Sequence, residues 1–180
     1  DAQSYGEFTG QGGIAFLSRL PIDVDGIRDF SEMLWRDLPR ARLPEGYFQP
    51  KDLDVVRLSS HAHWDIPVLW NDAPLHLFTY AATSPVFDGD EDRNGRSNAD
   101  ETRFWQLYLD GALALPPPAA PFVILGDSNL DPSDGDGLRV DMVALLSDPR
   151  LQDPKPRSDF GAEIANPDHL GDPALDTANW

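Results

Sequence analysis

The chain has 180 residues, 41% of them hydrophobic, which is the size of one globular domain that buries roughly 70% of its unfolded surface. Its 14 basic and 31 acidic residues give a net charge of −17, so the chain repels nucleic-acid backbones unless a cation intervenes. The absence of cysteine excludes disulfides and thiolate metal sites and leaves the redox compartment open, and no apolar run approaches the ~20 residues of a membrane span.

The first part of the chain is expected to alternate loops with short elements. Residues 5–13 are rich in glycine, and the apolar run at 14–17 predicts a buried strand that ends before Pro21. Between residues 27 and 38, apolar side chains recur at intervals that fit a short helix.

Three strands are predicted next, at residues 55–59, 66–70 and 75–80, and the Asn-Asp-Ala-Pro turn signal at 71–74 makes the last two a hairpin of an antiparallel meander. His61 and His63 lie between the first two of these strands. Two histidines two residues apart on a strand point the same way and could share a metal ion or a phosphate, and the alternative is two exposed loop histidines.

Residues 88–101 are the most polar part of the chain. Five of them match the ligand spacing of a calcium loop, D-x-[DN]-x-[DN]-G-x5-E: Asp90, Asp92, Asn94, Gly95 and Glu101. The context departs from an EF-hand, because a strand and Ser84-Pro85 precede the loop where a helix is required. The pattern therefore favours a single structural Ca²⁺ over a paired EF-hand.

A helix is expected over residues 101–115, where Phe104, Leu107 and Tyr108 share one side and three prolines follow. A second helix is expected over 138–146, and the prolines after Ser147 predict mostly coil. Three polar residues in that coil could ligate a metal or simply be exposed: Asp168, His169 and Asp172.

The stretch at 121–132, PFVILGDSNLDP, carries the main functional signal. An apolar strand at 122–125 breaks at Gly126, and Asp127 and Asn129 follow directly. Ligands bind at the carboxyl ends of strands in open α/β sheets, so these side chains are candidates for a site, and the alternative is that they only close an Asx turn. Together with the required cation, the pattern indicates metal-assisted attack of water on a phosphoester, with Asp127 fixing the water or metal and Asn129 stabilising phosphoryl charge.

Four stretches resemble the endonuclease/exonuclease/phosphatase family, whose fold is that of deoxyribonuclease I. They are GGIAFLSRLPI (12–22), RLSSHAHWDIPV (57–68), SPVFDGDEDRNGRSNADETRFW (84–105) and PFVILGDSNLDP (121–132). The third and fourth look most like a bacterial branch that combines an FDG-EDRNG-R-N-DE-RFW segment with a downstream GD-N-DP segment.

The resemblance implies an α/β fold, a four-layer α/β/β/α sandwich with two mixed, largely antiparallel sheets, in one domain over residues 1–180. It also implies divalent-metal-dependent hydrolysis of a phosphoester, with Mg²⁺ as the expected ion, and places Asp127 and Asn129 in catalysis. Arg57, Arg93 and Asn94 are expected near the substrate. The expected metal ligands are Asp127, Asp90, Asp92 and Glu101.

Several features that the resemblance implies have no counterpart in this sequence. The family has a metal-binding glutamate after an early strand and a late aspartate with a Ser-Asp-His segment, and Ala81-Ala82 stand where it has a histidine. We therefore expect a chain truncated at both ends and inactive alone. The alternative function is a non-catalytic Ca²⁺-binding or scaffold module that uses the acidic loops 88–101 and 127–136, and for an enzyme the charge favours a small or metal-shielded phosphoester over long nucleic acid.

Overall fold

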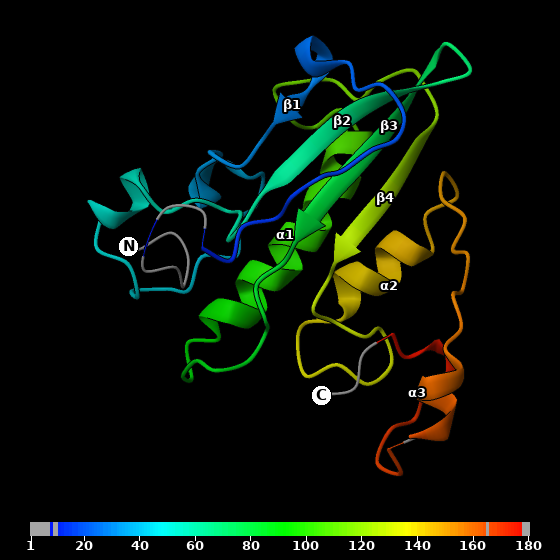
Figure 1. The fold of residues 1–180 in the computed structure, drawn as a ribbon. Coiled ribbons are helices and arrows are strands. Elements are labelled where there is room, and N and C mark those ends of the chain that lie inside the picture. Colours follow the sequence, from blue (N-terminus) through cyan, green and yellow to red (C-terminus); the bar gives the residue numbers. More distant parts are fainter. Residues whose placement is uncertain (1–7, 9–10, 165, 178–180) are drawn as a thin grey trace.

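The computed structural model describes residue 8, residues 11–164 and residues 166–177 (Figure 1). These residues form one mixed sheet in the order β1-β2-β3-β4, with three helices. The strands are β1 (Arg28–Asp29), β2 (His63–Trp70), β3 (Ala73–Ala81) and β4 (Phe122–Asp127). β1, β2 and β3 are antiparallel neighbours and β4 runs parallel to β3. The α/β class is confirmed, whereas the second sheet of the expected sandwich stays a prediction.

The hairpin of β2 and β3 confirms two of the three predicted meander strands. Asn71 and Asp72 both have positive φ angles, 51° and 62°, as a two-residue turn that matches strand twist requires. The strand predicted at 55–59 is wrong. Its start follows a 3-10 helix, η3 (Asp52–Asp54), and its contact with other backbone is a single bridge between Arg57 and Leu34.

The two elements predicted before residue 40 are also wrong. Residues 14–17 form no strand, and Leu17 is 89% exposed, because the outer edge of β2 is occupied by β1 and by a bridge from Ile22 to Val68. The dark-blue segment before β1 instead crosses the sheet face opposite α1 (Figure 1). Residues 27–38 contain β1 and η2 (Trp35–Asp37) in place of the predicted helix. Their backbone groups form hydrogen bonds with β2 and with the segment after η3, so they are not available for a continuous helix. Residues 5–7, 9 and 10 of the glycine-rich loop lie outside the described residues.

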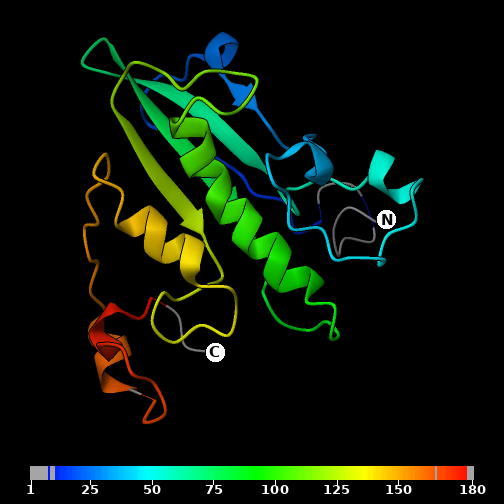
Figure 2. The same cartoon turned by 180° about the vertical axis from the view of Figure 1, so that it is seen from behind.

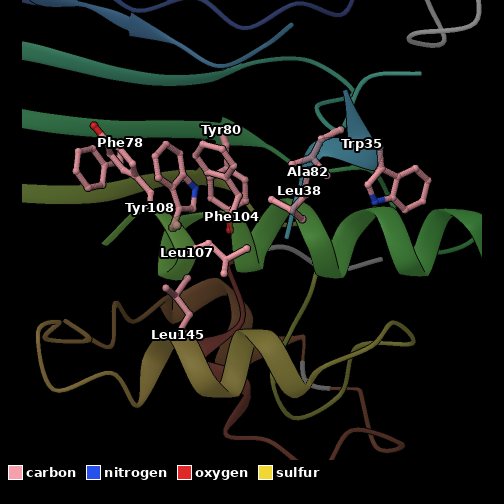
Figure 3. Close-up of a cluster of buried hydrophobic side chains, with 11 residues drawn as sticks. Trp35, Leu38, Phe78, Tyr80, Ala82, Phe104, Leu107, Tyr108 and Leu145 are labelled. Atoms are coloured by element: carbon pink, nitrogen blue, oxygen red, sulfur yellow. The ribbon is translucent and has the colours of Figure 1, made fainter. Parts of the chain in front are cut away.

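Helix α1 (Arg93–Leu109) lies between the sheet and α2 (Val140–Leu146) (Figures 2 and 3). Its Phe104 and Tyr108 face the strands, where Phe78 stacks on Trp105 at 5.1 Å between ring centroids. On the other side Leu107 faces α2 (Figure 3). Because α1 is covered on two sides, it forms the centre of the core.

Both ends of α1 differ from the prediction of 101–115. The helix begins at Arg93, eight residues earlier, because residues in its first half are buried polar side chains that an apolar periodicity does not reveal. It ends before Asp110 in a Schellman motif, in which Gly111 has φ 66° and the Gly111 and Ala112 amides bond to the Tyr108 and Leu107 carbonyls.

The C-terminal part is largely irregular, as predicted. It contains α2, the short α3 (Asp159–Glu163) and the 3-10 helix η4 (Pro173–Leu175), and the remaining 3-10 helix, η1 (Val24–Gly26), precedes β1. Within the described part of the chain, none of the helices combines the length and apolarity needed to cross a membrane.

Candidate functional site

Four segments converge where β3 and β4 end. Ala81 of β3 pairs with Asp127 of β4, and the Ala82 amide continues the pairing with a 2.8 Å hydrogen bond to the Asp127 carbonyl. β2 begins at the same end, since His63 pairs with Tyr80. The first half of α1 contributes side chains to the same place. This is the strand end at which the sequence predicts a site.

Gly126 is required by the close approach of β4 to β3. Its φ is 152°, and a Cβ at this position would lie 1.9 Å from the Tyr80 carbonyl oxygen. Every residue with a side chain would collide with β3 here. The glycine therefore allows Asp127 to leave the sheet beside Ala81.

Asp127 and Asn129 form the Asx turn that was one alternative in the sequence. The Asn129 amide donates to Asp127 Oδ1 at 3.0 Å, and Asn129 adopts φ 47°, a left-handed conformation that asparagine tolerates. The Asn129 Nδ2 donates to the Ala82 carbonyl at 2.9 Å. Asp127 is exposed, and its Oδ2 accepts no hydrogen bond from the residues that the structure describes. The turn thus holds one carboxylate oxygen and presents the other to solvent.

A row of buried polar side chains on α1 contacts the segments that follow β3 and β4. Asn94, Asn98 and Glu101 lie at positions i, i+4 and i+7, and all three are buried. Asn98 Nδ2 donates to the Thr83 carbonyl at 2.7 Å and to the Ser128 carbonyl at 2.8 Å, so it joins the segments after β3 and β4. Our sequence reasoning missed Asn98. The helical spacing of polar residues would have been the signal.

Glu101 is a buried carboxylate held by uncharged donors. It accepts hydrogen bonds from the Ser60 amide at 2.8 Å, the Ser60 hydroxyl at 3.1 Å and the Thr83 amide at 2.6 Å. No basic side chain among the described residues forms an ion pair with it. Burial raises the pKa of Glu101 to about 7, and the hydrogen bonds from Ser60 and Thr83 oppose that rise.

The two histidines of the 61–63 segment do not form a shared site. His63 is buried, with Nδ1 3.0 Å from the Ser59 hydroxyl and Nε2 3.0 Å from the Glu101 carbonyl. A carbonyl only accepts, so Nε2 carries the proton, and burial lowers the pKa of His63 to about 4. His61 precedes β2, is exposed, and lies 2.9 Å from the Ser60 hydroxyl. The loop alternative therefore holds for His61, and His63 is a structural residue.

The calcium-loop pattern folds into a different structure. Because α1 begins at Arg93, Asn94 and Gly95 are helical, and Glu101 contacts Ser60 and Thr83. The Nδ2 of Asn94 donates to the Val86 carbonyl at 2.8 Å.

Asp90 is exposed ahead of α1, and Asp92 is the residue before the helix, with φ 52° and no side-chain capping hydrogen bond, so the five residues do not surround one position. In residues 8, 11–164 and 166–177 no three His, Cys, Asp or Glu side chains are grouped so that they could hold a metal ion. That includes Asp168, His169 and Asp172 in the C-terminal coil, where Asp172 caps η4.

The two arginines predicted near the substrate have local contacts. Arg57 pairs with Glu32 at 3.2 Å, and Arg93 donates to the Asn94 side-chain oxygen at 3.0 Å. Their role in substrate binding stays a prediction.

The strand end offers oxygen atoms of the type that hard divalent cations such as Mg²⁺ and Ca²⁺ bind. Mg²⁺ is usually bound through one or two carboxylates, with water and substrate phosphate completing six oxygen ligands. Asp127 offers an exposed carboxylate oxygen, and the amide oxygen of Asn129 lies two residues away. These residues fit an ion shared with water and substrate, rather than one enclosed by protein ligands.

The sequence profile described as Endonuclease/Exonuclease/phosphatase family matches residues 2–179. Comparison with curated proteins and with solved structures finds no match. The matched range includes all four segments that converge where β3 and β4 end.

Proposed function

The chain belongs to the endonuclease/exonuclease/phosphatase family, and on this premise we propose that it is a phosphoester hydrolase whose substrate phosphate binds at the carboxyl ends of β3 and β4. The observation that carries the proposal is Asp127, an exposed carboxylate at the end of a strand beside β3, whose Oδ2 accepts no hydrogen bond from the described residues. Ligands of α/β sheets bind at such ends.

In this proposal Asp127 orients the attacking water through its outward oxygen, and Asn129 stabilises the phosphoryl oxygen. The Asn129 Nδ2 has two N–H groups, of which one is used on the Ala82 carbonyl, so one remains for a phosphate oxygen. A Mg²⁺ ion held by Asp127 would neutralise negative charge that develops on the phosphate. The arginines predicted to contact substrate, Arg57 and Arg93, are not required by these roles.

The substrate class is proposed from charge. A chain with a net charge of −17 gains little from releasing the counterions of a long polyanion. We therefore propose a small phosphoester, or one whose charge is shielded by the metal ion, as the preferred substrate.

A second sheet packed against the first belongs to the same proposal. Val123 and Leu125 are on the face of β4 opposite α1 and are 44% and 41% exposed, while Phe122 and Ile124 pack against the core. Strands that are apolar on both faces are typical of sheets covered on both sides. This supports the four-layer arrangement.

The test is hydrolysis of a chromogenic aryl phosphodiester by the purified chain with Mg²⁺, and hydrolysis by the wild type would overturn the expectation from the sequence that the chain is inactive alone. We expect Asp127→Ala to lower the rate at least 100-fold, because the water and the cation lose their carboxylate. The matched control is Asp131→Ala, which also removes an Asx-turn aspartate from the same loop, where it accepts from the Ser133 amide at 2.6 Å. Equal rates for the wild type and Asp127→Ala would refute the role of Asp127.

The calcium-binding alternative makes a different prediction. If the acidic segment before α1 bound a structural Ca²⁺, calorimetric titration would give heat in the micromolar to millimolar range. The helical conformation from Arg93 onward disfavours it, since it removes three of the five pattern residues from the loop. A wild-type chain without hydrolysis but with Ca²⁺ binding would favour the non-catalytic module.

A further inference from the structure

We infer that Asn98 and Glu101 of α1 are positioning residues that fix the Asn129 amide by holding the peptide groups on both sides of Thr83. The inference rests on the proposed function for its consequence in catalysis, while the geometry that carries it is independent of any substrate.

Thr83 is bound to one turn of α1 by backbone and side chain. Its amide donates to Glu101 Oε2 at 2.6 Å and its carbonyl accepts from Asn98 Nδ2 at 2.7 Å. Its hydroxyl lies 3.4 Å from the Ser97 hydroxyl. Two side chains three residues apart on a helix therefore hold both the donor and the acceptor of a single residue, which leaves the segment after β3 little freedom.

This constraint is transmitted to Asn129 from two directions. The carbonyl that accepts from Asn129 Nδ2 is that of Ala82, and Ala82 shares a peptide group with Thr83. The second N–H of Asn98 holds the Ser128 carbonyl at 2.8 Å, on the peptide group that leads into Asn129. Asn129 is thus held through its side chain from β3 and through its backbone from α1.

The orientation of the Asn98 amide follows from its partners. Both of its contacts at this end are carbonyl oxygens, which only accept, so Nδ2 and not Oδ1 must face them. Asn98 Oδ1 is buried and finds no hydrogen-bond partner within the described part of the chain. An unpaired buried acceptor lowers the free energy of unfolding. Asn98 therefore holds the segments after β3 and β4 together at a cost to the stability of the fold.

The position of the Asn129 amide matters for the rate if this group contacts the reacting phosphate. A displacement of about 1 Å in a group that orients substrate can cost on the order of 100-fold in rate. Asn98 and Glu101 do not themselves reach the solvent-exposed side of the site, since both are fully buried. They act on the reaction through Thr83, Ala82 and Asn129.

The experiment compares Asn98→Asp with Gln106→Glu. Both replace an amide of α1 by a carboxylate, but Gln106 bonds to Asp148, which follows α2, and not to the strand-end loops. We expect Asn98→Asp to lower kcat at least 30-fold with KM changed less than threefold, because its carboxylate repels both carbonyls. We expect Gln106→Glu to keep kcat within threefold of the wild type at a comparable loss of thermal stability.

A second readout needs no activity. In substrate-free protein, NMR signals of the Asn129 side-chain amide and of the Ala82 and Ser128 backbone amides should shift in Asn98→Asp and stay in place in Gln106→Glu. If Asn98→Asp does not fold, Asn98→Ser, which removes both hydrogen bonds without adding charge, takes its place.

The outcomes separate the two proposals. A wild-type chain without hydrolysis refutes the proposed function, and the NMR signals then still decide whether α1 holds Asn129. Unchanged Asn129 signals in the Asn98 variant, or equal shifts in both variants, overturn the positioning role. So does an Asn98 variant whose kcat equals that of the wild type.

Discussion

The sheet and α1 enclose two buried carboxylates with opposite surroundings. Asp65, near the far end of α1, is 2.5 Å from His76 Nδ1, accepts from the Tyr108 hydroxyl at 2.8 Å and lies 3.7 Å from the Arg28 guanidinium. Glu101, at the strand-end site, is held by amides and a hydroxyl and by no cation among the described residues. Both carboxylates have no exposed surface.

The two carboxylates differ in whether groups able to carry positive charge surround them. Around Asp65, groups able to carry positive charge come from β1 and β3, and the cluster joins these strands to β2 and α1. Around Glu101, an uncompensated carboxylate has a pKa displaced to about 7. A buried carboxylate without a positively charged partner is costly, so Glu101 keeps its proton to a higher pH than an exposed glutamate does.

The largest loss of stability at the strand ends that form the site is expected for Gly126→Ala. The added methyl group would overlap the Tyr80 carbonyl oxygen, so β4 must separate from β3 at the point where both strands end. We expect a loss of more than about 5 kcal/mol in the free energy of unfolding, or no folding, measured by urea denaturation.

The matched control for this variant is Gly111→Ala. Gly111 also has a positive φ, 66°, but open space surrounds the position of its Cβ. Only backbone strain is added, so a loss of about 1 kcal/mol is expected. Similar losses in the two variants would contradict the close approach of β3 and β4.

Neutralising each carboxylate in turn tests the comparison directly. At pH 8, Asp65→Asn should lose about 4 kcal/mol, because it leaves His76, Tyr108 and Arg28 without the partner that they share. Glu101→Gln should change stability by less than about 1 kcal/mol, since the lost hydrogen bond is offset by removal of an uncompensated buried charge. Urea unfolding of both variants measures the contrast, and equal losses would mean that the two surroundings are energetically alike.

The smallest expected effect concerns how the free energy of unfolding depends on pH. Glu101 and His63, which lie near the strand ends of the site, contribute to it with opposite signs. The folded-state pKa of Glu101 is raised from 4.5 to about 7, so its contribution to stability is present below pH 4.5 and is lost as the pH rises towards 7. The folded-state pKa of His63 is lowered from 6.5 to about 4, so its contribution is present above pH 6.5 and is lost as the pH falls towards 4. Between pH 4.5 and 6.5 the two contributions nearly cancel.

Single variants should reveal each contribution separately. In His63→Gln, stability should fall by about 2 kcal/mol as the pH rises from 4.5 to 6.5, and in Glu101→Gln it should rise by about 2 kcal/mol over the same range. Urea unfolding at several pH values measures both slopes. Slopes of the same sign would show that the folded-state pKa of Glu101 is not raised or that of His63 is not lowered.

The sequence predicted the parts of the fold that depend on local signals. The hairpin was predicted because Asn71 and Asp72 suit a tight turn, and β4 because an apolar run ends at a glycine. The elements before residue 60 were missed because their conformation depends on which strand edge they meet: residues 14–17 have the composition of a strand, but the edge of β2 is already occupied.

The site was predicted in one half only. Asp127 and Asn129 lie two residues apart at the end of a predicted strand, so their position could be inferred. Asn98, which was not predicted, reaches the site through the packing of α1 on the sheet. Glu101 was expected as a metal ligand in a calcium-loop pattern, and in the structure it accepts hydrogen bonds from Ser60 and Thr83. Short motifs describe spacing along the chain, and the helix that replaces the loop is stabilised by tertiary contacts that such spacing does not contain.

The pairing of Ala81 with Asp127 makes position 81 a place from which one side chain could enter the site. Ala81 is the residue of β3 directly beside the proposed catalytic aspartate, and the Ala81-Ala82 pair stands where the family resemblance implies a histidine. Since the backbone on both sides is held by strand pairing and by α1, a histidine at position 81 would need little rearrangement of the main chain to stand next to Asp127. One substitution, Ala81→His, would therefore place an imidazole beside Asp127 without rebuilding either strand.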